Sequence, residues 1–335
     1  MRHAPTVLVS FVSACTFTAP GPAGFAGPDV AATTATSDET GPPPDPATTG
    51  GSSSGGGTTT GAPAPPRFDL GGGADIPEAA PCPGIDVLFV IDDSYSMADE
   101  QANLVASFPG FSDGLLALVD GGLDVHVGVV TTDAYAFNEA GCTMVGALTT
   151  RTGGTGSSNA MCAPFSEGRY LTGADDLVAD FACAAQVGTE GDPKERPVLA
   201  ALEALAPTNL GEGGCNAGFR RAGAVFVTVI VTDEDDLEDT PGTPGDWYED
   251  LVARAGGDPA RVIVLSLVGH PKPNLCPPFQ WNGSEGAQIA SQLIEFTELF
   301  GPNGMVGDVC APDYAPFFDE ALALIETTCD ALPAG

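Results

Sequence analysis

The sequence predicts an α/β fold in which a mainly parallel central sheet carries helices on both faces. Apolar runs alternate with helix-like stretches from residue 82 onward, and no internal repeat interrupts them. The apolar runs are continuous, as in strands that are buried on both faces of a sheet. Right-handed crossovers would then bring the carboxyl ends of the parallel strands to one edge, where such sheets bind ligands. We therefore expect one folded domain over residues 81–335.

The expected elements follow one another along this domain. The first is the apolar strand 85–92, and a helix over 98–119 comes next, which Pro109 should kink or break. A second strand spans 124–133, and residues 134–172 form a long polar excursion that ends in a short edge strand. The remaining elements are expected as helix 174–186, helix 196–206, strand 224–233, helix 246–255, strand 261–270, helix 285–300, strand 305–309 and helix 314–332.

The N-terminal part of the chain has a different texture. Residues 1–15 have a basic start and a short apolar core, as in a secretory signal, and end in "VSAC", which resembles the lipobox of bacterial lipoproteins. We expect lipid on Cys15; an ordinary cleaved signal is the alternative. Residues 16–80 are rich in Thr, Pro, Gly and Ser and should form a disordered tether with a reach of about 45 Å. The protein would be secreted and lipid-anchored at the outer membrane, at the cell surface or in the periplasm, with no other membrane contact.

Charge and cysteine content narrow the function. The chain has 45 acidic and 11 basic residues, and its formal net charge of −34 argues against a nucleic-acid partner. If Cys15 carries lipid, eight of the nine cysteines remain, which predicts four disulfides in an oxidising compartment. We expect Cys82 to pair with Cys329, because these two bracket the folded region. Cys142 and Cys162 would close the loop between them.

Oxygen-bearing side chains follow three of the predicted strands. Asp92, Ser94 and Ser96 follow the first strand, Asp133 ends the second, and Asp233 ends the strand at 224–233. Buried carboxylates and hydroxyls are costly unless something compensates them. A set of hard oxygen ligands suits Mg²⁺, Ca²⁺ or Mn²⁺. Three histidines and no C-x-x-C pair leave little for a zinc site.

The D-x-S-x-S pattern after an apolar strand resembles the metal-ion-dependent adhesion site (MIDAS) of the von Willebrand factor A (vWA) domain family. The resemblance covers residues 82–332 and implies a Rossmann-like vWA sandwich with one antiparallel edge strand. It is closer to secreted, lipobox-bearing vWA proteins of myxobacteria and related bacteria, which share the tether and a "TTD…C…GTEG…TDEDD" run. In the family, serine hydroxyls bind the cation directly and the first aspartate acts largely through water. The resemblance implies the metal ligands Asp92, Ser94, Ser96, Thr189 and Asp233.

Two positions depart from the family pattern. The loop around Thr189 differs from the usual Gly-Thr-small sequence, and Glu234 stands where many relatives have glycine. The resemblance still implies a protein-binding or adhesion module, without enzymatic turnover, whose Mg²⁺ (or Ca²⁺ or Mn²⁺) accepts an Asp or Glu side chain of a protein partner. No G-x-S-x-G stands at a predicted strand-to-helix turn, as a nucleophile elbow requires, and no H-E-x-x-H occurs in the chain.

Four alternatives stay open. The domain could be a passive envelope scaffold with a structural metal, or a metal-assisted hydrolase built on Asp92, Asp93 and Asp233. The D-x-S-x-S segment could instead be a capping turn, with Ser96 as the N-cap of the helix at 98. The acidic run at 235–239 could bind a second Ca²⁺, although a solvated loop is favoured because the run lacks EF-hand spacing.

Overall fold

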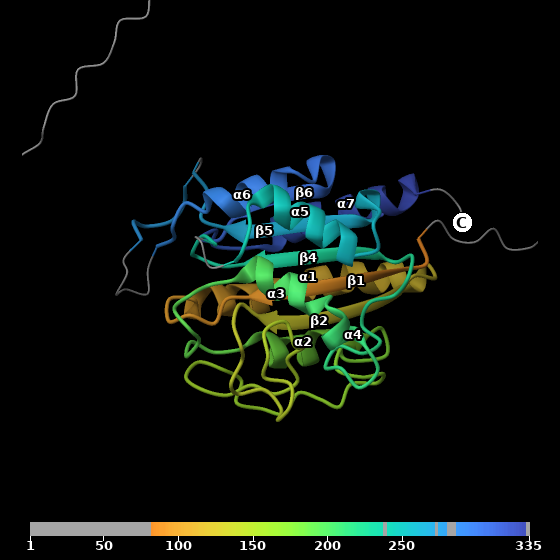
Figure 1. Ribbon diagram of the computed structural model, residues 1–335, viewed down its shortest axis with the longest axis horizontal. Coiled ribbons are helices and arrows are strands. Elements are labelled where there is room, and N and C mark those ends of the chain that lie inside the picture. Colours follow the sequence, from red (N-terminus) through yellow and green to blue (C-terminus); the bar gives the residue numbers. More distant parts are fainter. Residues whose placement is uncertain (1–81, 237–239, 272–273, 280–285, 333–335) are drawn as a thin grey trace, which may run out of the picture. The chain divides into compact units, whose positions relative to one another are not determined.

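The computed structural model describes residues 82–236, 240–271, 274–279 and 286–332. The expected signal segment, Cys15 and the tether 16–80 lie outside these residues. Six strands form one sheet in the order β3-β2-β1-β4-β5-β6, in which β3 is antiparallel to β2 and all other neighbours are parallel (Figure 1). The strands are β1 (Gly84–Ile91), β2 (Asp124–Thr131), β3 (Leu171–Thr172), β4 (Val225–Val231), β5 (Val262–Val268) and β6 (Gly304–Asp308). The expected fold class, with its single antiparallel edge strand, is confirmed.

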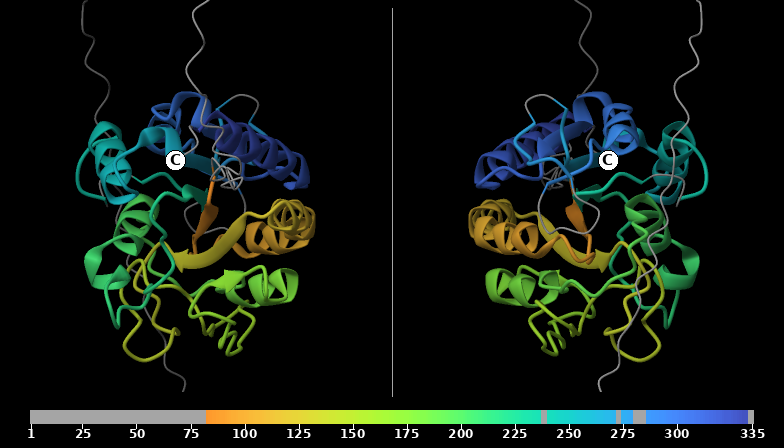
Figure 2. Two further views of the ribbon diagram at one scale, coloured as in Figure 1. Left: turned by 90° about the vertical axis from the view of Figure 1, so that its right-hand side faces the viewer. Right: turned by 90° about the vertical axis from the view of Figure 1, so that its left-hand side faces the viewer.

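Helices cover both faces of the sheet (Figure 2). The cores beneath them show that α1, α2 and α7 pack on one face, while α3, α5 and α6 pack on the other. The helices are α1 (Ala98–Asp120), α2 (Leu177–Ala185), α3 (Pro197–Ala204), α4 (Pro207–Leu210), α5 (Pro244–Arg254), α6 (Ser291–Glu298) and α7 (Ala315–Ala331), with short 3₁₀ turns at Pro259–Arg261 and Gly301–Asn303.

Strand β1 is buried along its whole length because it lies in the middle of this sandwich. Its side chains alternate between the two cores, so Phe89 faces α1 while Leu88 and Val90 face α3. Phe89 is fully buried, and truncating such a ring to alanine costs about 3–5 kcal/mol. The rings packed around it belong to Phe108, Phe111, Phe181 and Phe318.

Helix α1 runs without a break through Pro109, so the predicted break at this residue is wrong. A proline inside a helix removes one hydrogen bond, but here one face of the helix is anchored on both sides of it. The buried side chains on this face are Leu104, Phe108, Phe111 and Leu115. By length and composition α1 could cross a membrane, yet these contacts identify it as a core helix of the sandwich.

All eight cysteines of the described residues form disulfides. The expected Cys82–Cys329 bond is present. The expected Cys142–Cys162 bond is wrong, because the structure contains Cys142–Cys215 and Cys162–Cys183 instead. The excursion is thus fastened at two points to later parts of the chain instead of being closed on itself. The fourth bond joins Cys276 to Cys310, and the four together indicate an extracytoplasmic protein.

Candidate metal-binding site

The carboxyl ends of β1 and β4 lie side by side, which brings the D-x-S-x-S segment next to the T-D pair that follows β4. Ile91 pairs with Val231, and the Asp92 amide donates to the Val231 carbonyl at 3.0 Å. Asp92 is fully buried, and its two carboxylate oxygens accept from the Ser94 amide at 2.7 Å and from the Thr232 hydroxyl at 2.6 Å. These bonds hold the carboxylate in one orientation.

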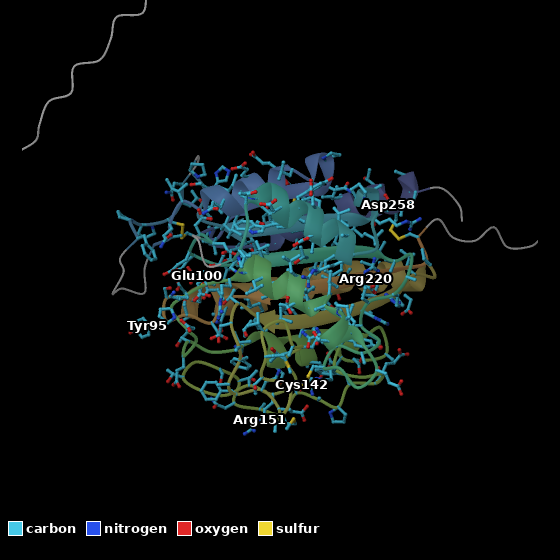
Figure 3. All side chains as sticks on the ribbon, viewed as in Figure 1. Tyr95, Glu100, Cys142, Arg151, Arg220 and Asp258 are labelled. Atoms are coloured by element: carbon cyan, nitrogen blue, oxygen red, sulfur yellow. A yellow bond between two sulfur atoms is a disulfide. The ribbon has the colours of Figure 1, made fainter. Side chains whose placement is uncertain are left out.

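Ser94 and Ser96 place their hydroxyls together at this edge. The two Oγ atoms are 3.3 Å apart, and both side chains are buried. Helix α1 begins after Met97, which is its N-cap and makes no side-chain capping bond. The alternative in which Ser96 caps the helix is therefore wrong. Between the two serines, Tyr95 is 71% exposed at the rim (Figure 3).

Asp233 is a buried acid whose charge the described residues do not compensate. It is 1% exposed, and neither carboxylate oxygen has a hydrogen-bond partner of ordinary distance and angle, although the Ser96 hydroxyl lies close enough to act on it. Burial raises the pKa of Asp233 to about 8, and the nearby Asp92 carboxylate adds to the rise, while the Ser96 hydroxyl offsets part of it. A cation bound beside Asp233 would therefore stabilise the ionised form of its carboxyl group.

Glu195 is a site residue that the sequence analysis missed. It lies just before α3, is 2% exposed, and accepts a hydrogen bond from Thr132 on Oε2, while Oε1 is buried without a partner. Burial, followed by repulsion from Asp92, raises the pKa of Glu195 well above its usual range. The signal available in the sequence was its place directly before a helix that starts at the carboxyl edge of the sheet.

Thr189 lies in the same loop as Glu195, but its side chain contacts the Thr155 backbone. Its hydroxyl and its amide both donate to the Thr155 carbonyl, at 3.4 and 2.9 Å. The preceding Gly188 is bonded to the Gln101 side chain, whose amide also donates to the Asp92 carbonyl at 2.9 Å. The loop is thus fastened to the backbone of Asp92, while the Thr189 side chain faces the excursion. Its role as a metal ligand stays a prediction.

Two further acids complete the acidic edge. Asp93 is 2% exposed with Oδ1 unpartnered, and burial together with the Asp133 charge raises its pKa to about 8. Asp133 accepts from the Asp192 amide at 2.8 Å, and the Gly191 amide donates to the Asp93 carbonyl at 2.8 Å. Asp93 and Asp133 therefore hold the loop that carries Glu195.

The donor set fits a hard divalent cation. It consists only of oxygens, and several of them are buried carboxylate atoms that lack a hydrogen-bond partner. Within the part of the chain that the structure describes, one trio of His, Cys, Asp or Glu has ligand atoms within 4.8 Å of one another, namely Cys276, Asp308 and Cys310. Its two sulfurs form a disulfide, so this trio is not a metal site. An ion at the D-x-S-x-S edge would accordingly be held by hydroxyls together with carboxylates, not by three carboxylates at once.

The neighbouring acidic run at 235–239 has a structural role at its first two positions. Both carboxylate oxygens of Asp235 accept from backbone amides in the first turn of α6, those of Gln292 and Leu293. Asp236 accepts from the amide and the hydroxyl of Thr240. These acids bind backbone groups, which favours a structural loop over a second Ca²⁺ site; Glu238 and Asp239 lie outside the described residues.

No protein-family model and no curated protein matches the sequence. Among solved structures, the chain is similar to proximal thread matrix protein 1 from the mussel byssus, with 12% identity over 74% of this chain and a TM-score of 0.37. This chain spans about half (48%) of that protein. It is also similar to the manganese-loaded TRAP protein of Plasmodium vivax, with 14% identity over 74% of each chain and a TM-score of 0.34. For human COPII-coat protein Sec24c the identity is 11%, the coverage 74% of this chain and 32% of that chain, and the TM-score 0.31. The fold class is defined by the strand order itself, which is that of a six-stranded, mainly parallel α/β sandwich.

Proposed function

We propose that this chain is an extracytoplasmic protein-binding module that captures an acidic side chain of a protein partner through a divalent cation, Mg²⁺ or else Ca²⁺ or Mn²⁺. One observation carries the proposal: buried, unpartnered oxygens of Asp233 and Glu195 lie at the strand ends that bear the paired serine hydroxyls. When bound, the ion would supply a positive charge that accepts an oxygen atom of the partner's carboxylate. No chemical turnover is part of this proposal.

Each residue of the site has a role that follows from its contacts. Ser94 and Ser96 offer neutral oxygens 3.3 Å apart, so they can bind a cation without cancelling its charge. Asp92 is oriented by Thr232 and by the Ser94 amide, and such fixed carboxylates position the groups that bind an ion. Asp233 supplies the negative charge whose burial is otherwise uncompensated. Glu195 joins this set as a further ligand candidate in addition to Thr189.

Tyr95 would supply the direct contact with the partner. It is the most exposed of the large apolar side chains among the described residues, and it lies between the two serines. An exposed aromatic ring beside a charged anchor is typical of residues that dominate protein–protein binding energy. Tyr95→Ala should therefore weaken partner binding and leave metal affinity unchanged.

The N-terminal part of the proposal concerns anchoring. We propose that lipid on Cys15 attaches the module to the outer membrane, at the cell surface or facing the periplasm, and that the tether 16–80 carries it away from the bilayer. Metabolic labelling with a fatty acid tests this. Label should enter the native chain and not a Cys15→Ala variant, whereas a cleaved, unlabelled product would favour an ordinary secretory signal.

Calorimetry on the full chain with Mg²⁺, Ca²⁺ and Mn²⁺ tests the metal site. At least one ion should bind, and Ser94→Ala or Asp233→Asn should weaken it by tenfold or more, because each removes an oxygen ligand or the main charge. Ser112→Ala is the matched control, since it deletes another buried hydroxyl, one without a hydrogen-bond partner, in the middle of α1. If no ion binds the native chain, the proposal is wrong.

A pull-down from the parent cell envelope, with and without a chelator, tests the partner. A protein retained by the native chain and lost on chelation or in Asp233→Asn would support capture through the metal. Metal binding without any partner lost on chelation would instead favour a scaffold with a structural ion. Metal-dependent hydrolysis of a generic phosphodiester or ester would favour the hydrolase alternative built on Asp92, Asp93 and Asp233.

A further inference from the structure

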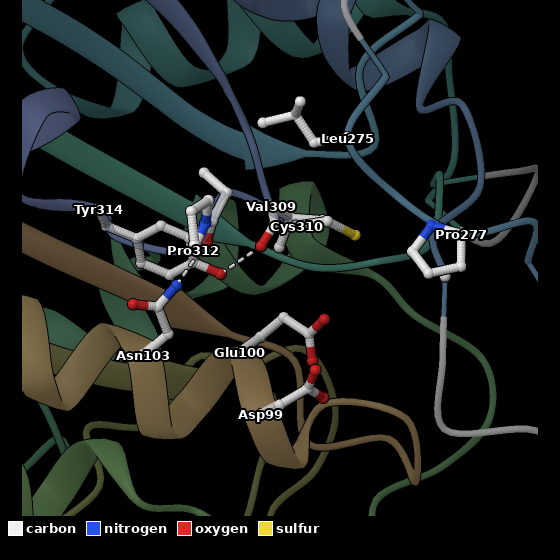
Figure 4. A pocket seen from close by; sticks show the side chains of 11 residues that line it. Asp99, Glu100, Asn103, Leu275, Pro277, Val309, Cys310, Pro312 and Tyr314 are labelled. Carbon is white, nitrogen blue, oxygen red and sulfur yellow. Dashed lines mark hydrogen bonds between the residues drawn. The ribbon is translucent and has the colours of Figure 1, made fainter.

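A pocket of about 630 Å³ opens next to the candidate metal-binding site (Figure 4). One side is the first turns of α1, and the other is the connection from β6 to α7 at 309–314. The Asn103 side chain donates to the Ala311 carbonyl at 2.7 Å, and the Cys276–Cys310 disulfide fastens the outer segment. The pocket is thus framed by bonds that hold its walls in place before any ligand arrives.

Glu100 supplies the unpaired polar group of this pocket. Its side chain is 6% exposed, its Oε2 is buried without a hydrogen-bond partner, and Figure 4 shows its carboxyl group pointing into the pocket beside that of Asp99. Burial raises the pKa of Glu100 to about 9, and Asp99 adds to the rise. None of the described residues that line the pocket is basic. The two acids therefore have no positive charge beside them among the described residues that line the pocket.

The pocket has apolar side chains along part of its wall, although polar atoms contribute more of its exposed lining than apolar atoms do. Leu275, 52% exposed, forms a lip, and the Tyr314 ring lies deeper, with its hydroxyl bonded to the Val309 carbonyl. A bare metal ion needs six or more converging oxygens, whereas the carboxyl groups of this pocket come from two adjacent residues on one wall. Apolar side chains beside these carboxyl groups instead match an alkyl stem with a cationic tip, the shape of a lysine or arginine side chain.

We infer that this pocket binds a lysine or arginine side chain of the protein partner, with its charged end between Glu100 and Asp99 and its stem against Leu275 and Val309. The inference rests on the proposed function for its partner and specifies that partner's chemistry. The partner would present one acidic side chain to the metal-binding site and one basic side chain to the pocket. The two sites are close enough for the Asp233 charge to act on Glu100. A segment in which acidic and basic residues lie a few positions apart would therefore bind both.

The test uses single amino acids as probes of the pocket, without any metal. The full chain, methyl-labelled and in EDTA, is titrated with the Nα-acetyl methylamides of lysine, arginine and norleucine. Lysine and arginine should shift the methyl resonances of Leu275 and Val309 saturably. Norleucine has the same stem without the charge and should bind at least about tenfold more weakly.

Variants assign the effect to the acids. Glu100→Gln keeps the size of the side chain and should weaken lysine binding about tenfold, because it removes the carboxyl group that would ionise beside the bound ammonium. The matched control is Asp113→Asn, which removes one negative charge from an exposed position of the same helix and should leave binding unchanged. The comparison of lysine with norleucine on the unaltered chain needs no variant, so it stands even if Glu100→Gln does not fold.

Three outcomes would overturn the inference. Equal binding of norleucine and lysine would make the pocket merely apolar. If neither cationic probe gives a saturable shift, the pocket does not bind a lysine or arginine side chain. Displacement of the lysine probe by Ca²⁺ in a Ser94→Ala, Asp233→Asn background would make it a metal site. The first two outcomes are measured without metal, and the third in a variant that lacks the candidate metal ligands. None of them therefore decides the calorimetry on the metal-binding site, and the two proposals can fail separately.

Discussion

Buried carboxylates lie near both ends of strand β1. The two ends differ in how far hydrogen bonds and opposite charges compensate these carboxylates. Near the amino end, Asp86 is fully buried and accepts hydrogen bonds from Arg220 at 2.9 Å, and from the Arg221 amide and Nε at 2.8 Å each. At the carboxyl end, Asp233, Glu195 and their neighbours keep buried oxygens without partners. Figure 3 shows Arg220 toward one end of the strands and Glu100 with Tyr95 at the other.

This difference separates a structural charge from a functional one. A buried charge is stable where the chain supplies its own counter-charge and hydrogen bonds, as the two arginines do for Asp86. Where the fold collects acids and leaves their oxygens unpaired, the acids either keep their protons, in line with the raised pKa of Asp233, or ionise against a positive charge from outside. The carboxyl edge is thus costly to the empty protein and favourable to the protein with a bound cation.

The largest expected effect comes from removing Asp86, the buried carboxylate that Arg220 and Arg221 compensate. Asp86→Ala should lower the free energy of unfolding by about 3–5 kcal/mol, because Arg220 and Arg221 would keep their charges without the buried partner. Urea unfolding in EDTA, with disulfides intact, measures it. The control is Asp124→Asn, since Asp124 pairs with Arg221 but is 63% exposed, and should cost less than about 1 kcal/mol. Equal costs for the two variants would contradict the distinction drawn here.

The second prediction concerns the carboxyl end of the strands, where a bound divalent cation would supply positive charge. A divalent cation at one hundred times its dissociation constant should raise the free energy of unfolding by about 2.7 kcal/mol, because it binds only the folded state. Thermal unfolding with Mg²⁺ or Mn²⁺, compared with EDTA, measures this gain. Asp86→Asn should leave the metal's stabilising effect unchanged, whereas Asp233→Asn should abolish it. A gain that persists in Asp233→Asn would place the ion elsewhere.

The third prediction concerns pH in the absence of metal. Asp233 has a folded pKa of about 8 against 3.8 for an unperturbed aspartate, so the folded state holds its proton more tightly than the unfolded chain does. The stabilising contribution is complete below about pH 3.8 and is lost as the pH rises through 8. Asp233→Asn should remove about 2 kcal/mol of the loss between pH 6 and pH 8. Denaturation in EDTA at both pH values is the measurement, and an unchanged slope in the variant would contradict it.

The smallest expected effect identifies the loop ligand. Glu195→Gln should weaken metal binding about tenfold, since its carboxylate lies beside Asp92 with one oxygen unpaired. Thr189→Ala should change affinity less than about twofold if its hydroxyl stays on the Thr155 carbonyl. Calorimetry on both variants decides between them. The reverse order would show that Thr189 turns toward the ion, as the resemblance to vWA domains implies.

Much of the fold could be predicted because burial on both faces of a sheet leaves a continuous apolar run in the sequence. Strand β1 was expected at 85–92 and lies at Gly84–Ile91. The break predicted at Pro109 did not occur. The rule that proline interrupts a helix considers only the lost hydrogen bond, and packing on both sides of Pro109 outweighs that loss. The pairing of Cys142 failed for a related reason. Closeness in sequence favours short loops, but the folded excursion brings Cys142 to Cys215, 73 residues away.

For the site, the sequence was informative where residues directly follow strands. Asp92 and Asp233 come immediately after β1 and β4, so the pairing of these strands brings them to one edge. Glu195 and Thr189 lie in a long loop, and only the folded path of that loop shows which side chain approaches Asp92. The pocket at Glu100 could not be predicted, since its far wall comes from residues more than 170 positions later.

The Cys82–Cys329 bond has a mechanical consequence. It joins the residue that leads into the central strand to the last turns of α7. A force applied to the chain before residue 82 would act on β1 and α7 together, so neither element could detach from the fold alone. Because β1 is flanked by parallel neighbours on both sides, tension along it loads many ladder hydrogen bonds together and does not open them one after another. A domain cross-linked in this way would unfold slowly under force, as the proposed anchoring and partner binding would require.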